Sequence, residues 1–307
     1  MQLRQLEYFV ALARERHFAR AAAACHVSQP ALSEAIRKLE HELGVPLVHR
    51  DQRFEGLTAE GERLVLWARR ILADHDALRH EVTALRTGLT GQLRLGVIPA
   101  AAASVAPLTD VFCAAHPLVR VQLETSLRSA DVIARIRRFE LDAGIIYPDA
   151  QDTSALRLTP LYTERHVLIA AAGLLDGQPA QLGWPEVPGL PLCLLTAGMR
   201  GRRLVDAALA ARGLTVTPQV ETDSIATLLA HVRTGRWASI IPHTWLTVLD
   251  RPGRIQAVRL EPAVTATVVV ATAANEPGSV LARAFRAVAA EHATTTGPVP
   301  GTDADQL

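Results

Sequence analysis

One stretch, FARAAAACHVSQPALSEAIRKLE at residues 18–40, limits the possible folds more than any other feature of this chain. Phe18–Cys25 is rich in alanine, which predicts a helix whose small side chains let another helix cross closely. A short turn at His26-Val27 follows, and Ser28 then offers a side-chain oxygen as an N-cap. Pro30 falls in the first turn of the second helix, where a missing N–H is harmless. Two helices joined by such a turn predict a helix-turn-helix.

The second of these helices has a polar side that suits a DNA groove. Its apolar residues Leu32, Ile36 and Leu39 recur at helical spacing, so they face inward. The outer side carries the residues that we expect to bind DNA, namely Gln29, Pro30, Ser33, Arg37 and Lys38. Gln29 suits bidentate pairing with adenine, and Arg37 suits guanine or a phosphate. The alternative is an ordinary helical hairpin with a solvated face.

The loop after this helix, from His49 to Arg53, is predicted to form a wing. Arg50 and Arg53 are placed there for phosphates or for a minor groove. Residues 1–57 hold eight basic and seven acidic side chains, so the case for DNA depends on their placement and not on net charge. We therefore expect residues 1–58 to form a winged helix-turn-helix DNA-binding domain.

A single long helix is predicted from Ala59 to Thr87, with Thr58 as its N-cap. Its apolar positions alternate in steps of four and three, which is the seam of two helices coiling around each other. The seam consists of Leu64, Ala68, Ile71, His75, Leu78, Val82 and Leu85, of which all but His75 are candidate dimerisation residues. Residues 59–88 are thus expected to be a linker that forms a dimer. The alternative is a helix that packs on its own domain, which favours a wider apolar stripe.

Beyond residue 91 the sequence predicts α/β structure in two lobes. Short apolar or β-branched runs predict strands, including Gln92–Val97, Ala143–Ile146, Val167–Ala171 and Thr265–Ala271. Helical patterns lie between several of them, and this alternation indicates largely parallel layers. The expected regulatory domain covers residues 92–307. Lobe I takes about 92–161 and 267–292, and lobe II takes about 162–266.

The second half favours ligand binding over catalysis. It contains no G-x-S-x-G, H-E-x-x-H or phosphate-loop motif, and no carboxylate pair with a convincing partner. Ligands of open α/β sheets bind beyond the carboxyl ends of strands. The candidate effector-binding residues at such ends are Ile98, Pro99, Ala100, Ser129, Tyr147, Thr196, Met199, Arg200 and Pro242. The segment Thr196–Arg203 contains a predicted helix start with three arginines, which suits binding of a small organic or inorganic anion. The alternative is that these arginines are solvated and bind no ligand.

Composition excludes several other classes of protein. Of 307 residues 49% are hydrophobic and 21% charged, with a formal net charge of +1, which is typical of a soluble globular chain. The three cysteines, Cys25, Cys113 and Cys193, lack metal-ligand spacing and are expected to be free thiols in a reducing compartment. We expect no cofactor, no metal, no membrane segment and no signal peptide, and hence a cytoplasmic protein. An enzyme with a helical appendage and a periplasmic solute-binding protein remain as rivals.

The motif SQPALSEAIRKLEHELGVPLVHRDQR, followed by LTAEGERL, resembles the N-terminal signature of LysR-type transcriptional regulators. The similarity continues through GQLRLGVIP, RFELDAGIIY, PLYTERHVLIAA and HVRTGRWASIIPH, and it covers roughly 290 residues. The resemblance implies a winged helix-turn-helix, a dimerising linker helix and a two-lobed effector domain like that of periplasmic binding proteins. It also implies a homotetramer made of two dimers, pseudo-palindromic double-stranded operators, contact with RNA polymerase and an effector pocket between the lobes.

Some positions depart from the pattern of that family. Glu34 and Glu55 place acids near the expected phosphates, which predicts a narrower or weaker contact with the DNA backbone. Ala100 stands where the family often has a hydroxyl residue, so either Ser129, Thr196 and backbone amides hold a ligand carboxylate or the ligand is different. Arg236-Trp237 interrupts the usual G-x-G of the second lobe, which predicts an unusual shape there.

Overall fold

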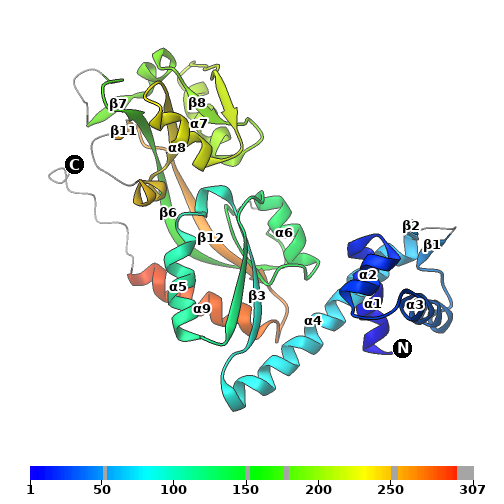
Figure 1. Cartoon of the computed structure of the whole chain (residues 1–307). Helices are drawn as coiled ribbons and strands as arrows, with labels where there is room; N and C mark the ends of the chain where they lie inside the picture. Colours follow the sequence, from blue (N-terminus) through cyan, green and yellow to red (C-terminus); the bar gives the residue numbers. More distant parts are fainter. Residues whose placement is uncertain (51–53, 149–152, 176–179, 250–254, 296–307) are drawn as a thin grey trace.

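The computed structural model describes residues 1–50, 54–148, 153–175, 180–249 and 255–295. Three bodies follow one another along this part of the chain: a small N-terminal domain, one long helix and a two-lobed α/β domain (Figure 1). The chain thus has the expected architecture.

The N-terminal domain combines three helices with a two-stranded antiparallel sheet. Its elements are α1 (Leu3–Glu15), α2 (Phe18–Ala24), α3 (Gln29–Leu43), β1 (Val48–Arg50) and β2 (Phe54–Leu57). Ser28 caps α3 as predicted, because its Oγ accepts a hydrogen bond from the N–H of Ala31 at 3.4 Å. Leu32, Ile36 and Leu39 of α3 are fully buried against α1 and α2. The predicted helix-turn-helix is confirmed.

One carboxylate ties α3 to the first strand of the wing. Glu40, near the end of α3, accepts hydrogen bonds from the backbone N–H groups of Leu47 and Val48 at 2.9 and 3.2 Å. The wing is therefore held in a set position relative to the helix that carries the predicted base-contacting residues.

The long helix, α4, spans Ala59–Thr87, the bounds that the sequence predicts. Its N-cap is Thr58, whose Oγ1 accepts from the N–H of Gly61 at 2.9 Å and donates to the carbonyl of Pro46 at 2.7 Å. At 1.5 Å per residue the helix is about 43 Å long. It leads away from the N-terminal domain to the near lobe of the α/β domain (Figure 1).

Lobe I has one core between helices and a sheet. Its elements are β3 (Gly91–Val97), η1 (Pro99–Ala101), α5 (Val105–Ala115), β4 (Val119–Glu124), α6 (Ser129–Arg137), β5 (Ala143–Ile146) and α9 (Val280–Thr295). The fully buried rings of Phe112 on α5 and Phe285 on α9 meet edge to face at 5.4 Å in this core.

Lobe II also combines helices with strands, but it has two apolar clusters where lobe I has one core. Its elements are β7 (Gln181–Gly183), η2 (Trp184–Gly189), β8 (Cys193–Leu195), α7 (Arg200–Ala210), β9 (Val220–Thr222), α8 (Ile225–Arg233), β10 (Ala238–Pro242), η3 (His243–Val248) and β11 (Ile255–Glu261). Trp184 is fully buried here, and its Nε1 donates to the carbonyl of Pro262 at 2.9 Å.

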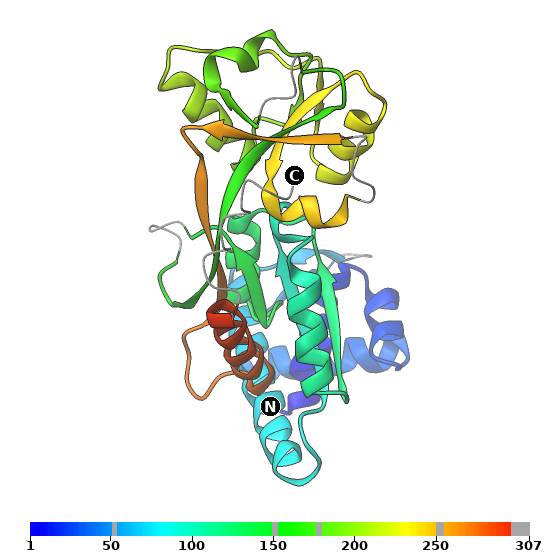
Figure 2. The ribbon, with the colours of Figure 1, turned by 90° about the vertical axis from the view of Figure 1, so that its left-hand side faces the viewer.

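Two long strands, β6 (Leu156–Ala171) and β12 (Thr265–Ala273), join the lobes (Figure 2). Residues 156–165 of β6 pair with β12, and residues 166–171 pair with β10 and β11, so the crossover falls near residue 165. The sheet order is β4-β3-β5-β12-β6-β11-β7, and β10 also pairs with β6.

Two sequence expectations about these strands need correction. We predicted largely parallel layers, but the pairing is mixed. The strand β3 is parallel to β4 and β5, β11 to β7, and β8 to β9. In contrast, β12 is antiparallel to both β5 and β6, and β10 and β11 are antiparallel to β6. The first part of β6 was also missed, because Leu156–Arg165 contains many polar residues and Pro160 interrupts it. A strand shared by two lobes is only half-buried where it leaves each core, so it lacks a continuous apolar run.

Candidate functional site

The first candidate site is the outer side of α3. Gln29, Pro30, Arg37 and Lys38 are exposed there, and Ser33 is half-buried. The five residues share one surface of the N-terminal domain, as the sequence predicts. Nη1 of Arg37 lies 3.5 Å from Oε2 of Glu34, one turn earlier on the same helix. This exposed pair is weak, but it occupies the guanidinium that we expect to contact DNA.

The wing is described only in part. The structure places Arg50 at the end of β1, but its side chain lies outside the described residues, and so does the whole of Arg53. Glu55, on β2, is exposed.

The predicted dimer seam on α4 divides into two halves. Near the N-terminus, Ala68 is only 2% exposed, and Leu64 and Ile71 are half-buried against the chain's own N-terminal domain. Near the C-terminus, Leu78, Val82 and Leu85 are 64%, 52% and 84% exposed. The alternative reading, in which the helix packs on its own domain, thus describes the first half, while the second half leaves an apolar surface uncovered.

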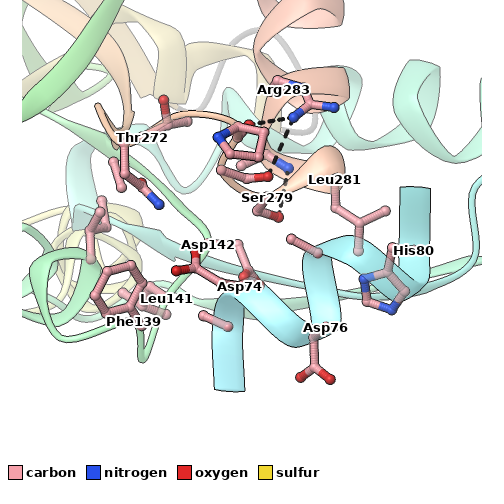
Figure 3. A pocket seen from close by; sticks show the side chains of 18 of the residues that line it. Asp74, Asp76, His80, Phe139, Leu141, Asp142, Thr272, Ser279, Leu281 and Arg283 are labelled. Carbon is pink, nitrogen blue, oxygen red and sulfur yellow. Dashed lines mark hydrogen bonds between the residues drawn. The ribbon is translucent and has the colours of Figure 1, made fainter. Parts of the chain in front are cut away.

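A groove of about 520 Å³ lies where α4 passes lobe I (Figure 3). On one side α4 contributes Asp74, Asp76 and His80, and on the other the loop before α9 contributes Ser279. Two ion pairs join the helix to lobe I beside this groove. Arg69 Nη1 lies 2.6 Å from Glu140 Oε1, and Arg283 Nη2 lies 2.7 Å from Glu81 Oε2. The linker and lobe I are therefore attached at both ends of their contact.

A second cavity, of about 460 Å³, lies between the lobes. Its lining includes eight of the nine predicted effector residues, which are Ile98, Pro99, Ala100, Ser129, Tyr147, Met199, Arg200 and Pro242. Thr196 is the exception. Its N–H donates to the carbonyl of Thr222 at 2.9 Å, so its backbone continues the parallel pairing of β8 with β9. The strand ends thus converge as the sequence predicts, and we call this cavity the cleft.

Sequence reasoning missed two buried titratable residues beside the cleft, Glu164 and His166. Both lie on β6 at the crossover, and they are 0% and 2% exposed. The hydroxyl of Tyr147 donates to Oε1 of Glu164, whereas Oε2 of Glu164 and both ring nitrogens of His166 have no hydrogen-bond partner. His166 Nε2 lies 3.9 Å from Glu164 Oε1, which is beyond hydrogen-bond distance. The sequence gives little signal for them, because Glu164 and His166 belong to the polar run Thr163–His166 that precedes the apolar residues Val167–Ala171.

Burial determines the protonation of this pair. It raises the pKa of Glu164 from 4.5 to about 7, against the opposing effect of the Tyr147 hydrogen bond. It lowers the pKa of His166 from 6.5 to about 4. The pKa of Tyr147 is raised as well, mainly by burial and, to a smaller extent, by the nearby charge of Glu164. Near neutral pH the imidazole is uncharged and the carboxyl is close to its midpoint.

None of the helices in the described ranges combines the length and apolarity that a membrane span needs. Within the same ranges no three His, Cys, Asp or Glu side chains gather as a metal site requires.

The comparisons with known proteins agree with this geometry. Residues 3–62 match the family described as bacterial regulatory helix-turn-helix protein, lysR family, and residues 86–294 match the LysR substrate binding domain. The SDS degradation transcriptional activation protein of a Pseudomonas strain is 35% identical over 268 residues, 85% of each chain. A probable hydrogen peroxide-inducible genes activator of Streptomyces viridosporus is 34% identical over 259 residues, 82% of this chain and 81% of that one. Full-length OxyR from Pseudomonas aeruginosa superposes with a TM-score of 0.76 at 29% identity, covering 95% of this chain and 94% of that one.

A helix-turn-helix domain joined by a long helix to a two-lobed domain with a cleft defines a DNA-binding transcriptional regulator with an effector-binding domain. The chain belongs to the LysR family of bacterial transcriptional regulators.

Proposed function

We propose that this regulator binds double-stranded operator DNA as a homodimer or homotetramer and senses a small anion in its cleft. Gln29, Ser33 and Arg37 would read bases, while Pro30 and Lys38 would lie along the same groove, and Arg50 and Arg53 would contact phosphates or a minor groove. Two winged domains would occupy successive major grooves, about 34 Å apart. The observation that carries the DNA-binding part is the exposure of this polar side of α3 over a fully buried apolar side.

Association through α4 is supported by the uncovered side chains of Leu78, Val82 and Leu85. Three exposed apolar residues on one stripe of a long helix are typical of a surface that a partner covers. Leu64 and Ile71 would contribute only their exposed edges to the contact between two chains. Ala68 would act within one chain, by letting α1 pack closely against α4.

The effector is proposed to bind between the lobes and to favour one degree of lobe closure. That closure would alter the geometry of the oligomer, the bending of the DNA and the contact with RNA polymerase. We propose a regulator in the cytoplasm, where the chromosome is, and not an enzyme, since the family consists of regulators.

Thiol-based sensing of peroxide is not favoured by the cleft, although a relative is named for peroxide induction. The described lining residues of the cleft include no cysteine. Cys193 is buried, and burial raises its pKa to about 11, which leaves it protonated and unreactive.

A gel-shift assay with the intergenic DNA upstream of the chain's own gene tests this proposal. Wild type should form a salt-sensitive complex, and Arg37→Ala should lose most of the affinity. Arg236→Ala, which changes an arginine on lobe II, is the matched control and should bind normally. Absence of any protected operator in DNase footprinting would refute the DNA-binding assignment.

A further inference from the structure

Buried polar atoms without a hydrogen-bond partner lie in and beside the cleft, and such atoms are rare in folded proteins. Both nitrogens of His166, Oε2 of Glu164 and Nε of Arg200 are buried without a partner. His166 and Arg200 line the cavity itself. Such groups need an explanation, and a polar ligand that completes their hydrogen bonds supplies one.

His166 is close to the start of a helix that no side chain caps. A Cβ built on Gly201, in the first turn of α7, would lie 3.8 Å from Nε2 of His166. The N-cap residue Met199 makes no side-chain hydrogen bond. The first-turn N–H groups of α7, an imidazole and the guanidinium of Arg200 thus surround one corner of the cleft, and all of them can donate to an oxyanion.

Apolar side chains line much of the remaining cleft, although the charged side chains of Arg128, Asp131 and Arg203 also line it. Its walls come from both lobes and include Ile98, Leu127, Ile133, Leu195, Ile225 and Ile240. A ligand that fits has one charged end and an apolar body.

We propose that the ligand is an organic oxyanion with an apolar body, that its head lies at the first turn of α7 beside His166, and that the Glu164–His166 pair takes up a proton when it binds. The proposal builds on the effector cleft of the proposed function and names its ligand class.

The charge balance gives the reason for the proton. An incoming anion is repelled by ionised Glu164 and gains only an uncharged N–H donor from neutral His166, so protonation of either residue strengthens binding. The other titratable or charged groups that line the cleft with His166 are Tyr147, Arg128, Asp131, Arg200 and Arg203, and His243 lies close enough to act on the pKa of His166. The carbonyl of Val264 also favours the charged imidazole. We assign the proton to Glu164, whose pKa burial raises to about 7, and to His166, whose lowered pKa a bound anion would raise.

Titration calorimetry of the full chain tests this directly. The ligands are isovalerate and phenylacetate, and their neutral amides, isovaleramide and phenylacetamide, serve as controls of the same shape. Measurements in buffers with different ionisation enthalpies give the number of protons taken up. For the acids we expect an uptake that approaches one proton per bound ligand. Their affinity should rise by up to about tenfold when the pH is lowered by one unit. The amides should bind more weakly and take up none.

Two variants locate the proton. The double variant Glu164→Gln with His166→Gln should abolish proton uptake by the acids, and His243→Gln, which changes the nearby histidine outside the cavity lining, should retain it. The inference would be overturned if the acids bound without proton uptake or if the amides bound as tightly as the acids. It would also be overturned if neither acid bound at all. Footprinting on the operator is independent of these results, so failure here leaves the DNA-binding proposal to be judged separately.

Discussion

The buried pair on β6 makes a quantitative prediction, because its two members have pKa values displaced in opposite directions. Burial raises the pKa of Glu164 from 4.5 to about 7 and lowers that of His166 from 6.5 to about 4. Each displacement is about 2.5 pH units, which corresponds to about 3 kcal/mol. The perturbation is to remove one titrating group at a time, with Glu164→Gln in one variant and His166→Gln in the other.

In wild type the two contributions cancel over much of the acid range. Between about pH 4.5 and 6.5 the folded chain holds one proton on Glu164, and the unfolded chain holds one on His166. The number of bound protons is equal in the two states, so this pair adds no slope to the stability curve.

Each variant should reveal one of the two slopes. In His166→Gln the folded carboxyl binds a proton that the unfolded one has lost. The free energy of unfolding should therefore fall by about 3 kcal/mol as pH rises from about 4.5 to about 7. In Glu164→Gln the unfolded imidazole binds the extra proton, and the free energy of unfolding should rise by about 3 kcal/mol from about pH 4 to about 6.5. Across the shared window the two curves diverge by about 5 kcal/mol.

Urea unfolding at a series of pH values measures these slopes. Tryptophan fluorescence follows the relevant transition, because three of the four tryptophans, Trp184, Trp237 and Trp245, lie in lobe II and Trp184 is fully buried there. All other titrating groups are common to both variants and cancel in the difference, while a lost hydrogen bond shifts a curve without tilting it. Parallel curves for the two variants would refute the opposed burial effects on which the reasoning depends.

Other features of the chain predict effects of stated direction. Arg37→Ala should weaken operator binding by about 1–3 kcal/mol in gel shifts, whereas Glu34→Gln should strengthen it by releasing the guanidinium; equal affinities of all three proteins would contradict both roles. Leu85→Asp should shift sedimentation equilibrium toward smaller species, while the same change at exposed Val248 should not, and an unchanged oligomer would remove α4 from the interface. Gly61→Ala should destabilise the N-terminal domain by about 1–3 kcal/mol in thermal melts, because the new Cβ would lie 2.1 Å from the Leu47 carbonyl oxygen; a higher melting temperature would show that the backbone adjusts freely.

Local chemistry made much of this molecule predictable from sequence. Ser28 and Thr58 cap their helices because short polar side chains reach the free N–H groups of a first turn, and this depends only on neighbours in sequence. The cleft was also predictable, because ligand loops of open sheets follow the carboxyl ends of strands.

What the sequence could not reveal depends on tertiary packing. The spacing of Leu64, Ala68 and Ile71 is the same whether the helix meets a second chain or its own domain, and only the folded chain shows the latter. Glu164 and His166 are unremarkable in a surface strand. They become notable only because β6 passes through both lobes and carries them into the interior between two cores.

The placement of these contacts suggests how an event in the cleft reaches the DNA. The linker helix is attached to lobe I through the ion pairs of Arg69 and Arg283, so lobe I and α4 should move together.

Lobe II is linked to lobe I by the strands β6 and β12 and by the hydrogen bond from Trp245 Nε1 to the Ala100 carbonyl at 2.9 Å. Ala100 itself lines the cleft, so a ligand there contacts the same short segment that holds the lobes together. A ligand head at α7 is carried by lobe II, and its body also contacts lobe I. We therefore expect the proposed ligand to change the angle between the lobes, and we expect lobe I to pass that change to the helix that positions the winged domain.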